Sequence, residues 1–153
     1  MGAEDRIREL NLTLPPSPKP IAVYSTAVRT GNLLFVSGHG PLQADGTLIK
    51  GRLGADLDIA AGQNAARVTG LAILATVRTH LGSLDNVVKP VKVLGMVNCT
   101  PDFVDHPAVI NGYSNLMVEV FGEAGKSARS AVGMPSLPGG IAVEIEAIFE
   151  VKD

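Results

Sequence analysis

The segment ARSAVGMPSLPGGIAVEIEAIFE, residues 128–150, contains the alternation that decides the fold. Its last part, continued to VEIEAIFEV (143–151), has an apolar residue at every odd position, and glutamate at three of the four even positions. Because successive side chains of a β-strand point to opposite faces, this pattern predicts a strand with one buried face. The Pro/Gly-rich part predicts a turn, and residues 128–134 predict a second strand, which carries Arg129.

The charged residues of this segment allow two interpretations. The strand pattern alone favours glutamates on a solvated sheet face. Ile148 shares that face, however, so partial cover could raise the pKa of Glu144 and allow it to act as an acid or base. Arg129 has small neighbours, and is either a surface charge or a guanidinium open to a carboxylate.

The remaining periodicity predicts an α+β domain with a mixed sheet and helices on one of its faces. We expect residues 1–18 to form an N-terminal arm, followed by one domain over 19–153. The apolar run LLFVSG (33–38) suggests a strand buried on both faces. The predicted elements are a short helix over 4–10, two strands on either side of the turn at 29–32, a short strand after a turn at 45–46, helices over 56–81 and 106–122, and strands over 86–100, 128–134 and 141–151.

Composition excludes several classes of function. The net charge is −2 without a basic run, which argues against a nucleic-acid partner. The single cysteine, Cys99, excludes an intrachain disulfide and fits a reducing compartment. The most apolar stretch (68–77) is too short to span a bilayer, and the charged N-terminus does not resemble a secretory signal. We therefore expect a soluble, cytoplasmic protein.

No metal or cofactor motif is evident. His39, His80 and His106 lack the spacing of a metal site. Cys99 ends a predicted strand and fits a buried apolar residue better than a nucleophile. The sequence SGHGP (37–41) is not a phosphate-binding loop, although Gly38 fits a position where the backbone comes close to a substrate or a neighbouring chain. We expect neither metal nor cofactor.

Taken together, these segments resemble the Rid/YjgF (reactive intermediate deaminase) family, also labelled endoribonuclease L-PSP. The similarity rests on Arg129-Ser130, the Leu-Pro pair at 137–138 and the alternating Glu strand, at the family's spacing without a gap. In the N-terminal half, a tyrosine in the first strand, Tyr24, precedes the TGN turn and VSGHGP at the family's separation. The resemblance covers residues 19–152.

The resemblance implies a chorismate-mutase-like fold and a homotrimer with clefts between subunits. It also implies hydrolysis of reactive 2-imino or enamine acids to 2-oxo acids and ammonia, without a cofactor. Arg129 would hold the substrate carboxylate and Glu144 would direct water. The other implied site residues are Tyr24 and Gly38, which line the cleft, Ala131, which replaces a common cysteine, and Asn111, a counterpart of the cleft asparagine.

Two alternatives stay open at this point. The first is a non-catalytic trimer that binds small carboxylates as a sensor or a chaperone-like partner, because Arg129 alone suffices for binding. The second is a ribonuclease or translation inhibitor, which the mild acidity and the lack of a basic groove disfavour. Ala131 leaves open whether a cleft without a thiol turns over an imine.

Overall fold

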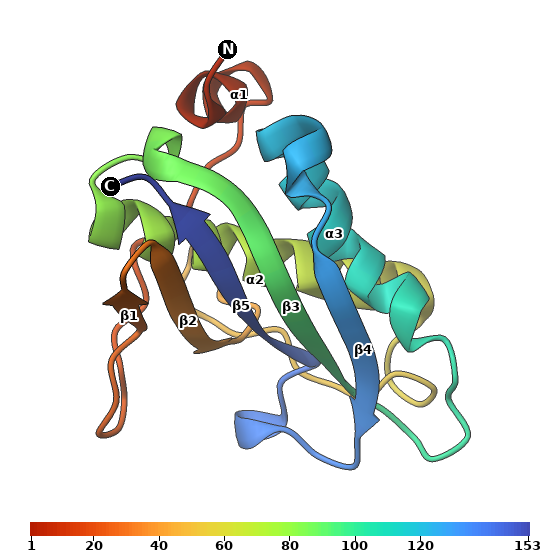
Figure 1. Ribbon diagram of the computed structural model, residues 1–153. Coiled ribbons are helices and arrows are strands. Elements are labelled where there is room, and N and C mark those ends of the chain that lie inside the picture. Colours follow the sequence, from red (N-terminus) through yellow and green to blue (C-terminus); the bar gives the residue numbers. More distant parts are fainter.

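A five-stranded mixed sheet organises the computed structural model, which describes all 153 residues (Figure 1). The strand order is β1-β2-β5-β3-β4, and only β3 and β4 are parallel neighbours. This confirms the predicted α+β class with a mixed sheet. The strands are β1 (Ala27–Thr30), β2 (Leu33–His39), β3 (Val87–Asn98), β4 (Ala128–Met134) and β5 (Val143–Val151).

The predicted short strand after residue 46 is wrong. That segment forms only isolated bridges, Leu42 with Leu48 and Lys50 with Ile141. Its backbone groups close a local turn, in which the Gly46 amide donates to the Gln43 carbonyl at 3.0 Å. The ladder therefore never extends, although the turn itself lies where it was predicted.

Two long helices, α2 (Ile59–Leu81) and α3 (His106–Phe121), lie across one face of the sheet (Figure 1). Asp58 caps α2, because its Oδ1 accepts a hydrogen bond from the Ala61 amide at 2.8 Å. The helix ends at Gly82, whose φ of 80° is in the left-handed region.

No helix combines the length and apolarity that a membrane crossing requires. Three short 3₁₀ helices are η1 (Leu84–Asn86), η2 (Gly122–Gly125) and η3 (Pro138–Gly140).

The two faces of the sheet differ in cover. Cross-strand partners share a face, and the row Val93, Gly95 and Val97 of β3 is buried beneath the helices. We call this side the helix face. The opposite side, the open face, has no helix over it in this chain, and it leaves Phe35 of β2 41% exposed. The prediction that residues 33–38 are buried on both faces is therefore wrong for the single chain.

The N-terminal segment docks on this domain through a short helix, α1 (Ala3–Glu9). Its Ala3 and Ile7 side chains belong to the hydrophobic core. Arg78 of α2 donates two hydrogen bonds to the Glu4 carboxylate, at 3.0 and 2.6 Å. Glu4 also accepts a bond from the amide of Leu84. Burial raises the pKa of Glu4, but these hydrogen bonds outweigh it and hold that pKa below its ordinary value.

Candidate functional site

Strand β4 places Arg129 on the helix face, next to α3. Arg129 pairs with Val93 of β3, and its Nη1 donates to Asn111 Oδ1 at 2.9 Å and to Ser114 Oγ at 3.2 Å. Ala131, two residues farther along β4, is partly buried against the core. Arg129 takes part in none of the ion pairs of the chain. Its Nε and Nη2 donors are therefore available to an anion.

Glu144 lies on the open face. It pairs with Met96 of β3, and its carboxylate lies directly against Gly38, where a Cβ would collide with Oε2. Glycine at 38 thus makes room for this carboxylate. A hollow of about 660 Å³ opens here, and its lining includes Tyr24, Gly38, Glu144 and Glu146. Tyr24 precedes β1, which begins at Ala27, so the expectation that it lies in the first strand is wrong.

A bulge in β2 presents Gly38 to Glu144. The pairing of β2 with β5 shifts between Val36 and His39. The His39 imidazole turns into the core, where its Nε2 lies 2.7 Å from Thr76 Oγ1 of α2 and its Nδ1 lies 2.6 Å from the Ser37 carbonyl oxygen. Burial lowers the pKa of His39. This histidine is therefore an anchor for the bulge, and it leaves the Gly38 backbone facing the hollow.

The environment of Glu144 makes its carboxylate a better base than an ordinary one. Burial raises its pKa, and the nearby negative charge of Glu146 raises it further. A carboxylate with a raised pKa binds a proton more strongly than an ordinary one, as a general base requires. Glu144 also has no hydrogen-bond or ion-pair partner of its own to neutralise that charge.

The structure does not bring Arg129 and Glu144 together in one chain. Arg129 and Ala147 both pair with Val93, whereas Glu144 pairs with Met96, three residues farther along β3. Residues an odd number of positions apart on a strand point to opposite faces. Arg129, Asn111 and Ala131 therefore form one group on the helix face, and Glu144, Gly38 and Tyr24 form another on the open face.

Ser114 is a member of the first group that sequence reasoning missed. It contacts Arg129 together with Asn111. The two residues are three positions apart on α3, so they lie on the same side of that helix. This spacing is visible in the sequence, and it would have marked Ser114 once Asn111 was chosen.

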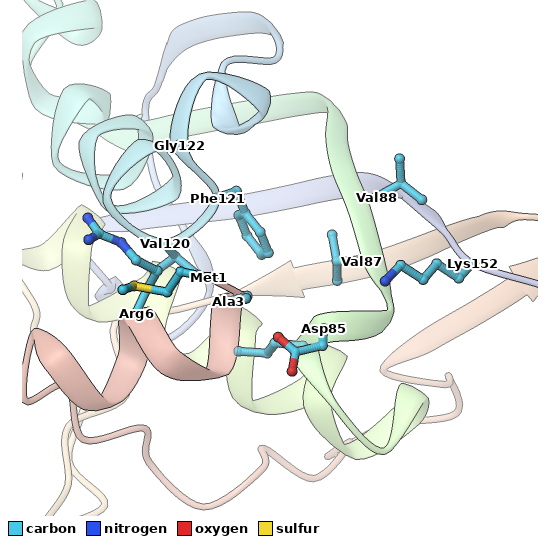
Figure 2. A pocket seen from close by; sticks show the side chains of 12 residues that line it. Met1, Ala3, Arg6, Asp85, Val87, Val88, Val120, Phe121, Gly122 and Lys152 are labelled. Carbon is cyan, nitrogen blue, oxygen red and sulfur yellow. The ribbon is translucent and has the colours of Figure 1, made fainter.

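Another hollow, of about 540 Å³, lies between α1 and the start of β3 (Figure 2). Val87 and Phe121 lie at its centre, with Lys152 at one side and Arg6 at the other (Figure 2). Arg6 is already engaged, because it donates to the Glu119 carbonyl at 3.0 Å and to Glu9. None of the predicted site residues lines this hollow.

In the whole chain, no group of three or more His, Cys, Asp or Glu side chains could hold a metal ion.

Comparison with known proteins defines the class of this α+β chain. The family model described as "YjgF/chorismate_mutase-like, putative endoribonuclease" matches residues 4–146. A crystal structure of the protein Atu1372 from Agrobacterium tumefaciens, of unknown function, superposes with a TM-score of 0.90 and 43% identity, covering 98% of this chain and 92% of that one. The chain belongs to the YjgF/chorismate-mutase-like family.

Two curated relatives illustrate the range of names in this family. Protein TCP17 of Trypanosoma cruzi is 39% identical over 148 residues, which cover 96% of this chain and 92% of the relative. A 2-iminobutanoate/2-iminopropanoate deaminase of Dermatophagoides farinae is 29% identical over 143 residues, covering 92% and 95%. The resemblance in the sequence to the Rid/YjgF family is thus confirmed.

Proposed function

We propose that this protein is a hydrolytic deaminase of small 2-imino or enamine acids, which it converts to 2-oxo acids and ammonia. The observation that supports this most directly is the pair of unneutralised groups, the Arg129 guanidinium and the half-buried Glu144 carboxylate. The deaminase name of the relative at 29% identity agrees with it. The chemistry needs one cation for the carboxylate of the substrate and one base for water.

In this proposal, Arg129 binds the substrate carboxylate. Asn111 and Ser114 accept hydrogen bonds from Nη1 and fix the guanidinium plane, while Nε and Nη2 face the ligand. Such a two-pronged contact orients the imine carbon as well as holding the anion. The small side chain of Ala131 leaves space beside the fork.

Glu144 acts as the base. Water attacks the C=N carbon as Glu144 takes one of its protons, and that proton then passes to the nitrogen, which gives a carbinolamine. In the second step Glu144 takes the hydroxyl proton as the C=O bond forms, and the proton passes to the nitrogen, which leaves as ammonia. A raised pKa suits Glu144 to receive the proton and to return it to the leaving nitrogen. The close contact with Gly38 restricts its side chain, and Tyr24 lines the same hollow.

A complete site in this proposal needs two copies of the chain. One copy supplies Arg129 from its helix face, and its neighbour supplies Glu144 from its open face. The open face carries Phe35, Val28 and Val132 as exposed apolar side chains, which a second copy would cover. We propose that three copies form a ring with clefts between them, because a closed ring repeats one heterologous contact without leaving an unpaired half-site.

The test generates the imine in place. An amino-acid oxidase produces a 2-imino acid, and formation of the 2-oxo acid and ammonia is followed with and without the protein. We expect acceleration by the wild type, and a loss of about 10- to 100-fold in kcat/KM for Arg129→Ala, because hydrogen bonds to a charged group are worth about 1.5–3 kcal/mol. Arg129→Lys, the matched control, keeps the charge and loses the fork, so it recovers only part of the rate. No acceleration with any of a panel of amino acids refutes the proposal.

A non-catalytic carboxylate-binding trimer is the second candidate. It is favoured by one observation: the Arg129–Asn111–Ser114 group is complete within one chain and does not depend on Glu144. Glu144→Gln distinguishes the two functions, because it abolishes turnover in the deaminase but spares carboxylate binding in both. Calorimetric titration with a 2-oxo acid reports that binding directly.

A further inference from the structure

A thiol and an imidazole meet at the end of β3, away from both groups described above. Cys99 follows the last residue of β3, and His106 is the first residue of α3. Cys99 Sγ lies 3.5 Å from His106 Nε2. The ring of Phe103 meets the imidazole edge-on, with the ring centroids 5.5 Å apart, and so restricts its orientation. A thiol within reach of an imidazole is the arrangement of an activated nucleophile.

Gly133 of β4 makes this approach possible. A Cβ at this position would collide with His106 Nε2 and would lie 2.8 Å from Cys99 Sγ. Gly133 is four residues beyond Arg129, or about 13 Å along the strand. The cavity beside the pair, of about 350 Å³, contains none of the residues of the proposed deaminase site. It is therefore a separate place on the molecule.

Arg52 gives this cavity a cation. Its Nη2 donates to the Cys99 carbonyl oxygen at 2.7 Å, and its Nε is buried without any hydrogen-bond partner although the residue lines the cavity. Arg52 also takes part in no ion pair of the chain. A β-bridge between Leu53 and Cys99 fixes the loop that carries it. Nη1 of Arg52 donates to no group of the chain and is not among the buried atoms, so a carboxylate in the cavity can accept a hydrogen bond from it.

We propose that Cys99, His106 and Arg52 form a reactive thiol site that captures small carbon electrophiles bearing a carboxylate. His106 takes the proton from Sγ, and the sulfur attacks the electrophilic carbon. A C–S bond forms as the bond to the leaving group breaks, and the leaving group departs with its electron pair. Arg52 binds the carboxylate of the electrophile. This activity needs one chain, and it is independent of Arg129 and Glu144.

The probe is iodoacetate, compared with the neutral iodoacetamide. Cys99 is the one cysteine of the chain, so intact mass reports its alkylation without ambiguity, with Cys99→Ser as the blank. We expect Cys99 of the folded protein to be alkylated faster than Cys99 of the unfolded chain. The ratio of the rate with iodoacetate to the rate with iodoacetamide should be about tenfold higher in the folded protein, because the Arg52 charge attracts the carboxylate of iodoacetate. His106→Gln should slow both reagents by about 10- to 100-fold.

Two further variants separate the roles. Arg52→Met should remove the preference for iodoacetate, and Arg52→Lys, which keeps the charge, should retain much of it. Gly133→Ala should slow both reagents, because its Cβ separates the thiol from the imidazole. A variant that unfolds is recognised by the loss of its cooperative urea unfolding transition. The proposal is overturned if native Cys99 reacts no faster than the unfolded chain, if His106→Gln leaves the rate unchanged, or if Arg52→Met keeps the preference.

Discussion

Arg129→Ala and Glu144→Gln, each strongly impaired alone, should restore activity when their subunits are mixed. In one chain the two residues lie on opposite faces of the sheet, since Arg129 pairs with Val93 and Glu144 with Met96. Every complete site then takes its arginine from one subunit and its glutamate from the next. A mixed ring contains some clefts in which neither contributing residue is substituted.

The size of the recovery follows from this geometry. In a random equal mixture, half of the subunits retain Arg129 and half retain Glu144. The chance that a cleft receives both is about one quarter in any closed ring. The mixture should therefore show about 25% of the wild-type rate per site. Alone, Glu144→Gln should remain about 100-fold or more below the wild type, the usual contribution of a positioned acid–base group, and Arg129→Ala about 10- to 100-fold below it.

The assay is 2-oxo acid formation from imine generated by an amino-acid oxidase, after the two variants have been unfolded together and refolded. Each variant treated alone is the baseline. Native mass spectrometry of the refolded mixture tests the exchange itself, because rings that contain both variants have masses between those of the two pure rings. Refutation is clear: if exchange is demonstrated and the Arg129→Ala and Glu144→Gln mixture stays at baseline, the cleft does not combine these residues from two chains.

Other predictions concern charge, packing and the N-terminal helix. Glu146→Gln should move the acid limb of kcat/KM to lower pH, because activity requires ionised Glu144 and removal of the neighbouring charge lowers the raised pKa of Glu144; a pH–rate profile with an unmoved limb contradicts this. In the wild type, the free energy of unfolding should fall as pH rises from the ordinary carboxyl pKa through the raised pKa of Glu144, because the folded state binds more protons than the unfolded state in this range. Glu144→Gln should abolish this fall, which denaturant titrations at several pH values measure. Gly112→Ala should cost about 1–3 kcal/mol in a urea titration, because its Cβ would lie 2.8 Å from the Gln63 carbonyl carbon and force α2 and α3 apart; an unchanged midpoint argues against that close contact. Ile7→Ala should cost about 2–5 kcal/mol if α1 is part of the cooperative core, and almost nothing if the helix is only loosely attached.

The sequence predicted most of the local structure because each signal was local. The cap Asp58 and the glycines at 82 and 122 bound the two long helices close to the predicted positions. The register of β3 with β5 shifts on both sides of Pro90, which has no backbone N–H to donate to the neighbouring strand. Where the prediction failed, as for the short strand after residue 46, the segment meets its partners only at isolated bridges, and how far such pairing extends is not a local property.

The alternation in 143–151 determined by itself that Glu144 points away from the buried face of β5, because side-chain direction has a period of two along any strand. It could not determine which face Arg129 takes. That depends on β3 lying between β4 and β5 and on its register with each of them. The same holds for Cys99 and His106, which stand seven residues apart in sequence and meet only because the chain turns from β3 into α3 beneath Gly133. Contacts between elements are set by the packing of the whole chain, so only the tertiary structure decided which functional groups face one another.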